Sequence, residues 1–248
     1  MTTRTILRIS LAAATLTLAL VACGGGDGRS TTGDEPEAAP PAAAEASTPA
    51  SADALVARSG ADLAVFARPG DPAPALTLPA TTEFGSDRAL LVDRVEGDWL
   101  QVLLPTRPNG STGWIRGGDV ELRQVDEAIE IDLAARTLRL LVDGRVVVSA
   151  PVAIGTPDNP TPTGHFYVVD KLATGDPDDD YGPIAFGLSG HSVKLTDFAG
   201  GDGQIGIHGT NDPASIGRAV SHGCIRVAND VITQLADLVP LGAPVVIG

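Results

Sequence analysis

The chain has 248 residues, 17 basic and 31 acidic side chains, and a formal net charge of −14. Such an acidic balance argues against a nucleic-acid-binding protein, which requires a basic surface. Glycine (29 residues) and proline (19) are frequent while aromatic residues make up 4%, which favours a turn-rich, mainly β protein with one large or two small domains.

The first 22 residues have the features of an export signal. Arg4 and Arg8 precede an apolar run, Ile9–Ala22, that is too short to span a membrane comfortably. The run ends in Leu-Val-Ala directly before Cys23, an ending that resembles the lipobox of bacterial lipoproteins. The resemblance implies a signal peptide over 1–22 and a lipid on the sulfur of Cys23, so that the exported protein is anchored to a membrane. An ordinary secretory signal is the alternative.

Residues 23–54 form the next segment and consist largely of Ala, Pro, Glu, Ser, Thr and Gly. Because almost no large apolar side chain is present, the segment cannot bury enough surface to offset its chain entropy. We therefore expect a disordered tether between the lipid anchor and the folded part of the chain.

A first β-rich unit is predicted over 55–123. Gly97–Val102 and Gly113–Ile115 resemble segments of bacterial SH3-like domains, which implies a small barrel. Trp99 and Trp114 are expected to pack in the core or at its rim, since buried aromatic residues are commoner than exposed ligand platforms. The role expected for this unit is positioning. The strands predicted from short apolar runs and turn signals are 63–66, 75–78, 90–95, 99–104 and 114–115.

A second unit is predicted over 127–248. Apolar residues alternate strictly along Ile129–Leu133. Asp143-Gly144 stands between two runs of strand-forming residues and predicts a hairpin with a type I′ turn. Further strands are predicted at 167–169, 191–195, 204–208 and 244–247.

A short helix is predicted near the C-terminus. Asn229 is a candidate N-cap, and Val231, Leu235 and Leu238 fall on one face of the helix that follows. The second unit is therefore expected to be dominated by β strands, with one or two short helices.

Cys224 is the residue with the clearest chemistry. With Cys23 assigned to a lipid it is the remaining cysteine, and its polar neighbours are not those of a core residue. A thiol beside glycine, with His208 upstream, suits nucleophilic acyl transfer, in which the histidine takes the thiol proton and its protonated form lowers the pKa of the cysteine. Gly223 allows a tight turn, so that the N–H groups of His222, Gly223 and Cys224 could form an oxyanion hole.

Four residues are candidates for substrate binding, each with a structural alternative. Arg226 suits a substrate carboxylate or, equally, a structural salt bridge. Ser221 either contributes to the site or bonds to the local backbone. Tyr181 follows an acidic run, 176–180, that is expected to be a solvated flap or a cover of the substrate groove rather than a calcium loop. His191 either lines the groove or packs within a strand.

The histidines of the sequence show neither a nearby acid nor metal-ligand spacing. No Asp or Glu lies within three residues of His208 to orient its ring. A zinc site is disfavoured because His222 and Cys224 stand closer together than paired zinc ligands usually do. We expect neither a metal nor an organic cofactor.

Five motifs follow one another in a recognisable order. They are Gly155-Thr156, Thr161–Gly164, Tyr181–Pro183, Ile207–Asn211 and Ser221–Arg226. This set resembles the L,D-transpeptidase (YkuD-type) catalytic domain over 127–248. The last two motifs are highly specific, whereas Thr-Pro-Thr-Gly is only supporting. The resemblance implies a β-sandwich-type domain that follows the SH3-like barrel.

The resemblance also implies a substrate and a mechanism. Cys224 would attack the third residue of a peptidoglycan tetrapeptide stem, D-Ala would leave, and an amine of another stem would resolve the thioester. The backbone carbonyl of Gly209 would take the place of a triad acid and orient His208. Carbapenem-type β-lactams would be covalent inhibitors, and the lipid-anchored protein would face the cell wall.

Two alternatives stay open at this point. Water could replace the amine as acceptor, which gives an L,D-carboxypeptidase. The chain could also be a non-catalytic lipoprotein that binds the cell wall. The presence of His208, Cys224 and Arg226 together argues against a decayed site.

Overall fold

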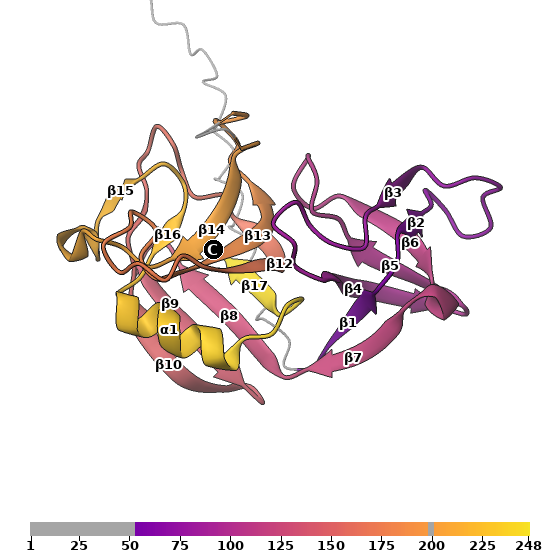
Figure 1. Ribbon diagram of the computed structural model, residues 1–248, viewed down its shortest axis with the longest axis horizontal. Coiled ribbons are helices and arrows are strands. Elements are labelled where there is room, and N and C mark those ends of the chain that lie inside the picture. Colours follow the sequence, from indigo (N-terminus) through magenta and orange to yellow (C-terminus); the bar gives the residue numbers. More distant parts are fainter. Residues whose placement is uncertain (1–52, 198–200) are drawn as a thin grey trace, which may run out of the picture. The chain divides into compact units, whose positions relative to one another are not determined.

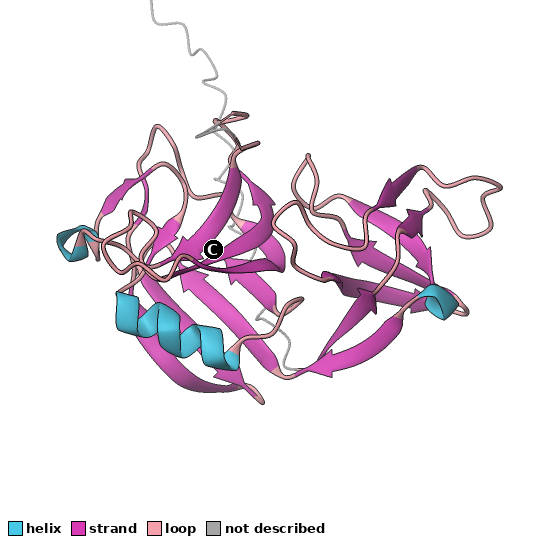
Figure 2. Ribbon diagram, viewed as in Figure 1, coloured by secondary structure: helices cyan, strands magenta, loops and turns pink. Residues whose placement is uncertain are grey.

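The computed structural model describes residues 53–197 and 201–248, which belong to one compact unit. Strands dominate these residues, and helix α1 (Asn229–Leu238) is the longest helical element (Figure 2). The predicted signal peptide 1–22, the lipidated Cys23 and nearly all of the tether 23–54 lie outside the described residues. Within the described part of the chain, no helix is both long enough and apolar enough to cross a membrane.

Five antiparallel strands form a sheet in the first part of the chain, in the order β6-β5-β4-β1-β7 (Figure 1). A separate pair of strands, β2 and β3, and a short 3₁₀ turn, η1, complete this part. The elements are β1 (Ala54–Ser59), β2 (Leu63–Val65), β3 (Leu76–Leu78), β4 (Arg88–Glu96), β5 (Trp99–Leu103), β6 (Thr112–Arg116), η1 (Gly117–Asp119) and β7 (Glu121–Val125).

The five short strands predicted for this part are present as β2 to β6, whereas β1 and β7 of the sheet were not predicted. Trp114 is 7% exposed, and the ring of Trp99 meets that of Phe66 edge-on with centroids 5.2 Å apart, so both tryptophans pack as expected. The assignment of this part to SH3-like domains stays a prediction.

Eight strands form one sheet in the second part, in the order β10-β9-β8-β17-β12-β13-β14-β16. The same part of the chain also contains a separate pair of short parallel strands, β11 and β15, and a 3₁₀ turn, η2. The elements are β8 (Glu127–Asp132), β9 (Thr137–Val142), β10 (Arg145–Pro151), β11 (Ile154–Gly155), β12 (Gly164–Ala173), β13 (Ile184–His191), β14 (Gln204–His208), η2 (Pro213–Ser215), β15 (Ala219–Ser221), β16 (Ile225–Arg226), α1 and β17 (Pro244–Ile247).

The long strand β12 is where this sheet changes direction. Its first residues, Gly164–Tyr167, pair with β17, and its residues from Val168 to Ala173 pair with β13, with a register shift between Val168 and Asp170. The β-sandwich-type domain expected from the sequence therefore takes the form of one curled sheet. The predicted type I′ hairpin is also present, since Asp143 and Gly144 both have positive φ, 50° and 70°, between β9 and β10.

The curled sheet and α1 enclose one apolar core. Ile232 and Leu235 of the helix are fully buried in it, together with Phe186 and Ile207 of the sheet. Leu238, which the sequence placed on the buried face, is 40% exposed, and Val239 just beyond the helix is buried in its place.

The predicted capping of α1 by Asn229 is wrong. Asn229 is the first residue of the helix, Ala228 occupies the N-cap position, and no side chain caps the helix. The side-chain amide of Asn229 bonds instead to the backbone of Thr210 and of Pro177.

The two sheets share buried side chains. Tyr167 of β12 is fully buried among residues of the first sheet, and its hydroxyl donates to Leu103 O at 3.3 Å. Val56 of β1 packs into the core of the second sheet, next to Gly242 in the turn before β17.

Gly242→Ala is expected to destabilise the protein more than Gly217→Ala. Both glycines have positive φ, +88° and +81°, but a Cβ on Gly242 would overlap the side chain of Val56 whereas one on Gly217 would meet nothing within 4 Å. Backbone strain should cost roughly 1–2 kcal/mol at both positions. Overpacking should add about 1–3 kcal/mol at Gly242 alone. Urea unfolding of the two variants checks this, and equal losses of stability would contradict it.

Candidate active site

The parallel pairing of β14 with β16 brings the two predicted catalytic residues to one face of the sheet. Ile207 lies opposite Ile225, and His208 lies opposite Arg226. Both isoleucines are fully buried, so the alternation of side chains turns His208, Arg226 and the preceding Cys224 to the other face. Cys224 and His208 line the same cavity, which has a volume of about 420 Å³.

The ring of His208 is fixed by the next residue of the chain. His208 is 4% exposed, and its Nδ1 lies 2.6 Å from the carbonyl oxygen of Gly209. A carbonyl oxygen can only accept, so Nδ1 carries the proton and the neutral ring keeps a free lone pair on Nε2. The hydrogen bond expected between His208 and the Gly209 carbonyl is therefore present.

The thiol and the imidazole are both neutral at neutral pH. Burial lowers the pKa of His208 to about 4, an effect that the Gly209 hydrogen bond opposes and the charge of Arg226 strengthens. Burial also raises the pKa of Cys224, against the lowering effects of a hydrogen bond from Gly206 and of the Arg226 charge. Both shifts favour the neutral thiol and the neutral imidazole over the pair of thiolate and imidazolium. That a protonated imidazole lowers the pKa of the cysteine stays a prediction.

Gly206 belongs to the site although the sequence analysis did not single it out. Its backbone N–H donates to the sulfur of Cys224. A Cβ on Gly206 would lie 2.8 Å from Phe186 O, so the strand pairing tolerates only glycine here. The sequence signal for it is a glycine inside a strand pattern, which marks a close approach of backbone or ligand.

The hydroxyl of Ser221 holds the turn that carries the thiol. Its Oγ donates to Cys224 O at 2.6 Å and accepts from the N–H of Gly223 at 3.1 Å. Ser221 is 2% exposed, so the local backbone bonding foreseen as an alternative is present and the predicted substrate-binding role is wrong. The oxyanion-hole prediction is also wrong for the Gly223 amide, because this donor already bonds to Ser221. For the amides of His222 and Cys224 it stays a prediction.

Thr161 fixes the same turn from another segment of the chain. Its Oγ1 donates to Gly223 O at 2.8 Å and accepts from the N–H of Gly155 at 2.9 Å. The carbonyl of Gly223 and the N–H of Cys224 belong to one planar peptide, so the bond to Thr161 sets the direction of that N–H. The Thr-Pro-Thr-Gly motif thereby contacts the cysteine turn directly.

Tyr181 lies beside His208 in the wall of the cavity. The two ring centroids are 4.7 Å apart with the ring planes inclined by 51°, and Tyr181 is 40% exposed. Partial burial raises the pKa of its hydroxyl, and the nearby Cys224 raises it further, so the hydroxyl stays a proton donor. The structure brings Tyr181 to the site, and its contact with substrate stays a prediction.

The side chain of Asn229 connects the segment after His208 to the acidic segment 176–180 through hydrogen bonds. Its Oδ1 accepts from the N–H of Thr210 at 2.7 Å, and its Nδ2 donates to Pro177 O at 3.1 Å. Gly209 packs so closely against Oδ1 that a Cβ there would overlap it. The amide predicted to cap α1 therefore holds the segment after His208 and the acidic segment that contains Pro177.

Arg226 and His191 lie outside the wall of the cavity that contains Cys224. Arg226 acts on the site through its charge, and its Nε is buried without a hydrogen-bond partner. His191 lines a neighbouring cavity, where its Nε2 lies 2.9 Å from Asp202 Oδ2. The expectation that His191 lines the groove beside the thiol is therefore wrong. The substrate contact expected of Arg226 stays a prediction.

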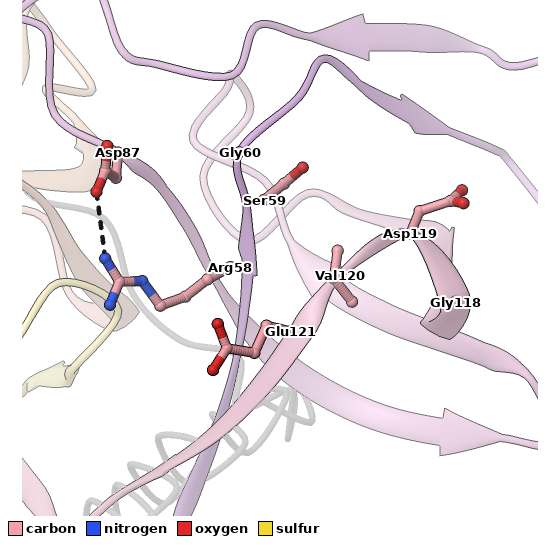
Figure 3. A pocket seen from close by; sticks show the side chains of 8 residues that line it. All are labelled: Arg58, Ser59, Gly60, Asp87, Gly118, Asp119, Val120 and Glu121. Atoms are coloured by element: carbon pink, nitrogen blue, oxygen red, sulfur yellow. Dashed lines mark hydrogen bonds and ion pairs between the residues drawn. The ribbon is translucent and has the colours of Figure 1, made fainter.

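A further hollow, of about 480 Å³, lies in the first sheet (Figure 3). Arg58 and Asp87 point toward one another across it, with Nη2 and Oδ2 3.3 Å apart, and Glu121 lies nearby. Its eight lining residues include no cysteine or histidine. It therefore offers none of the nucleophilic chemistry of the Cys224 cavity.

Comparisons with known proteins relate the part of the chain that contains Cys224 and His208 to L,D-transpeptidases. The family profile described as the L,D-transpeptidase catalytic domain matches residues 126–247. A Bacillus licheniformis protein named YkuD, assigned to the L,D-transpeptidases, is 35% identical over 152 residues, which cover 58% of this chain and 84% of that protein. The YkuD protein of Bacillus subtilis is 39% identical over 119 residues, 48% of this chain and 64% of its own length. The chain thus spans less than two thirds of the B. subtilis protein.

Among solved structures, an L,D-transpeptidase from Mycobacterium smegmatis aligns with a TM-score of 0.42 at 20% identity, over 64% of this chain and 82% of that one.

His208→Gln is expected to make the stability less dependent on pH. As the pH falls, the unfolded chain protonates His208 near its ordinary pKa of 6.5, whereas the folded protein does so only near a pKa of about 4. Protonation of His208 therefore destabilises the folded wild type across this window, by at most about 3 kcal/mol. Urea unfolding at pH values of about 7, 5.5 and 4 should show the wild type losing stability relative to the variant. A stability difference that does not change with pH would contradict the depressed pKa.

Proposed function

This chain belongs to the L,D-transpeptidase family, and from that membership and the geometry of its site we propose that it is a cysteine acyltransferase that cross-links peptidoglycan. Its acyl donor is the tetrapeptide stem, and its acceptor is an amine of a second stem. The observation that carries the proposal is the cavity shared by Cys224 and His208, with the His208 ring held by the Gly209 carbonyl.

The first step forms a thioester on Cys224. The sulfur attacks the carbonyl carbon of the third stem residue while Nε2 of His208 takes the thiol proton, and Nδ1–H stays bonded to Gly209 O. When the tetrahedral intermediate collapses, the bond to the nitrogen of the terminal D-Ala breaks. The imidazolium returns its proton to that nitrogen, so D-Ala leaves as a neutral amine.

The second step resolves the thioester. The acceptor amine attacks the thioester carbonyl, His208 takes a proton from the attacking nitrogen, and the carbon–sulfur bond breaks. The imidazolium then protonates the sulfur, which restores the neutral thiol and imidazole. The neutral resting pair described above supports this cycle, because the base is free at the start of each step.

The negative oxygen of each tetrahedral intermediate needs a hydrogen-bond donor. We assign this role to the N–H of Cys224. Thr161 and Ser221 support the assignment, because their hydroxyls hold the carbonyls on either side of this residue's peptide, at Gly223 and at Cys224 itself.

The charge of the cavity wall favours a substrate with a free amino group. Glu83 and Asp202 are among the residues of the wall, the Asp202 carboxylate lying 2.9 Å from His191 Nε2, and no Lys or Arg is among its described residues. A protonated amine of a diamino acid in the stem is therefore attracted to the cavity. This observation supports a stem peptide whose third residue carries such an amine.

Incubation of the soluble protein with a carbapenem is expected to give a stoichiometric covalent adduct at Cys224. Intact-mass measurement should show the adduct on the wild type and none on Cys224→Ala, because the thioester needs the sulfur. His208→Gln should acylate about 10²- to 10⁴-fold more slowly, since it lacks the base. Absence of an adduct on folded wild-type protein would contradict the enzyme and favour a wall-binding role.

Incubation of the protein with disaccharide-tetrapeptide distinguishes an amine acceptor from water by the products that form. Cross-linked dimer with release of D-Ala supports the transpeptidase. Conversion to tripeptide without dimer would show that water is the acceptor and that the protein is an L,D-carboxypeptidase.

Thr161→Val is expected to slow acylation while Thr161→Ser leaves it nearly unchanged. Valine has a similar shape but cannot donate to Gly223 O, so the Cys224 N–H loses its fixed direction. The rate should fall by about 10-fold or more, toward the roughly 10²- to 10³-fold cost of losing one oxyanion donor. Stopped-flow acylation by a carbapenem measures it, and a thermal melt of each variant serves as the folding control. Equal rates for the valine and serine variants would contradict this role.

A further inference from the structure

A loop of the first sheet reaches the chain segment that forms one wall of the Cys224 cavity. The loop connects β5 and β6 and carries Arg107, whose guanidinium donates to three backbone carbonyls in the connection between β13 and β14. Nη1 donates to Ser192 O at 2.6 Å. Nη2 donates to Leu195 O at 2.9 Å and to Asp202 O at 2.7 Å. One side chain thus bonds to both ends of the connection between β13 and β14.

Asn109 of the same loop adds two bonds at the end of β13. Its Oδ1 accepts from the N–H of His191 and its Nδ2 donates to His191 O, each at 2.8 Å. The ring of His191 in turn lies 2.9 Å from the carboxylate of Asp202. Asp202 is therefore held through its main chain by Arg107 and through its side chain by His191.

The segment held in this way borders the thiol. Residues 201–206 line the cavity together with Cys224 and His208. Within the segment, Gly203 has a φ of +80°, and a Cβ on it would overlap Leu195 O. The N–H of Ser192 also donates to Gly203 O at 2.8 Å. The wall therefore follows a path that only glycine can adopt at position 203, and it packs tightly against Leu195, one of the residues that Arg107 bonds.

We propose that Arg107 is a positioning residue of the active site, which fixes the wall 201–206 by bonding the carbonyls of Ser192, Leu195 and Asp202. The proposal rests on the proposed function in one respect, that the donor binds in this cavity. An arginine suits the task because its planar fork directs several N–H groups at once, which a lysine ammonium cannot match.

The geometry separates the effect of Arg107 from the chemistry of the thiol. Arg107 does not line the Cys224 cavity, and its bonds to Ser192, Leu195 and Asp202 do not involve Cys224 or His208. Gly206, the wall residue that bonds to the sulfur, is held separately by its pairing with Gly187 of β13. Loss of the guanidinium should therefore weaken the binding of large substrates against the wall. The intrinsic reactivity of the thiol should not change.

The test compares Arg107→Met with Arg107→Lys and with Arg123→Met. The methionine variant keeps the apolar stem and loses all three bonds, and the lysine variant can keep some of them. Arg123→Met is the matched control, because it removes the same charge from an exposed ion pair with Glu121 on β7. A thermal melt of each full-length variant shows whether it is folded.

In Arg107→Met, acylation by a carbapenem should slow about tenfold and KM for the tetrapeptide donor should rise by a similar factor. Alkylation of Cys224 by iodoacetamide, a small reagent that does not need the wall, should stay within about twofold of wild type. Arg107→Lys should fall between wild type and Arg107→Met, and Arg123→Met should match wild type.

Two outcomes would overturn the proposal. Unchanged acylation in folded Arg107→Met means that the wall does not depend on Arg107. A parallel loss of acylation and alkylation means that Arg107 acts on the thiol itself. If Arg107→Met does not fold, Arg107→Lys with rates equal to wild type overturns the proposal as well.

Hydrogen–deuterium exchange makes the test independent of the proposed function. Amides within 201–206 should exchange faster in Arg107→Met than in wild type and in Arg123→Met, whether or not the protein is acylated. A wild-type protein that gives no carbapenem adduct would overturn the proposed function alone. Unchanged exchange in 201–206 would overturn the positioning role alone.

Discussion

The parallel pairing of β14 with β16 is the constraint on which the site depends. It sets Ile207 beside Ile225 in the core, and this one register places His208, Arg226 and Cys224 on the opposite face. A shift of one residue would turn the thiol into the core and an isoleucine into the cavity, because side chains alternate along a strand. The apolar packing that stabilises the fold therefore also selects the arrangement of the reactive groups.

His208 is oriented by a backbone carbonyl and not by a carboxylate, and this changes the electrostatics of His208 and Cys224. The carbonyl of Gly209 fixes the tautomer of His208 as an acid would, but it brings no negative charge to stabilise an imidazolium. Burial and the cation of Arg226 then hold the pKa of His208 low, and burial holds that of Cys224 high. Under the proposed mechanism, the proton would then move from sulfur to imidazole only as the thiol attacks.

The sequence was most informative where the signal is local. Alternation along Ile129–Leu133 and the Asp143-Gly144 turn are confirmed as strand and hairpin, because neighbouring residues decide both. Asn229 looked like a helix cap, yet its amide bonds to Thr210 and Pro177. Such partners, distant in sequence, become visible only when the chain is folded.

The same limit explains the other differences at the site. The bond of the Gly223 amide to Ser221 removes it from the oxyanion hole, although both residues stand in the motif that identified the nucleophile. The sequence left open whether His191 lines the substrate groove or packs within a strand, because the bonds of Asn109 and Asp202 that hold His191 come from distant parts of the chain. Gly206 carried only the signal of a glycine inside a strand pattern, and that signal does not say that the neighbouring group is a sulfur.

The raised pKa of Cys224 has a consequence for the redox chemistry of the chain. Peroxides and disulfides react with a thiolate and hardly at all with a thiol. At neutral pH the buried sulfur is almost entirely protonated, so its oxidation to a sulfenic acid and its exchange with other disulfides are slow. The environment that raises the pKa of Cys224 therefore also slows its reaction with oxidants.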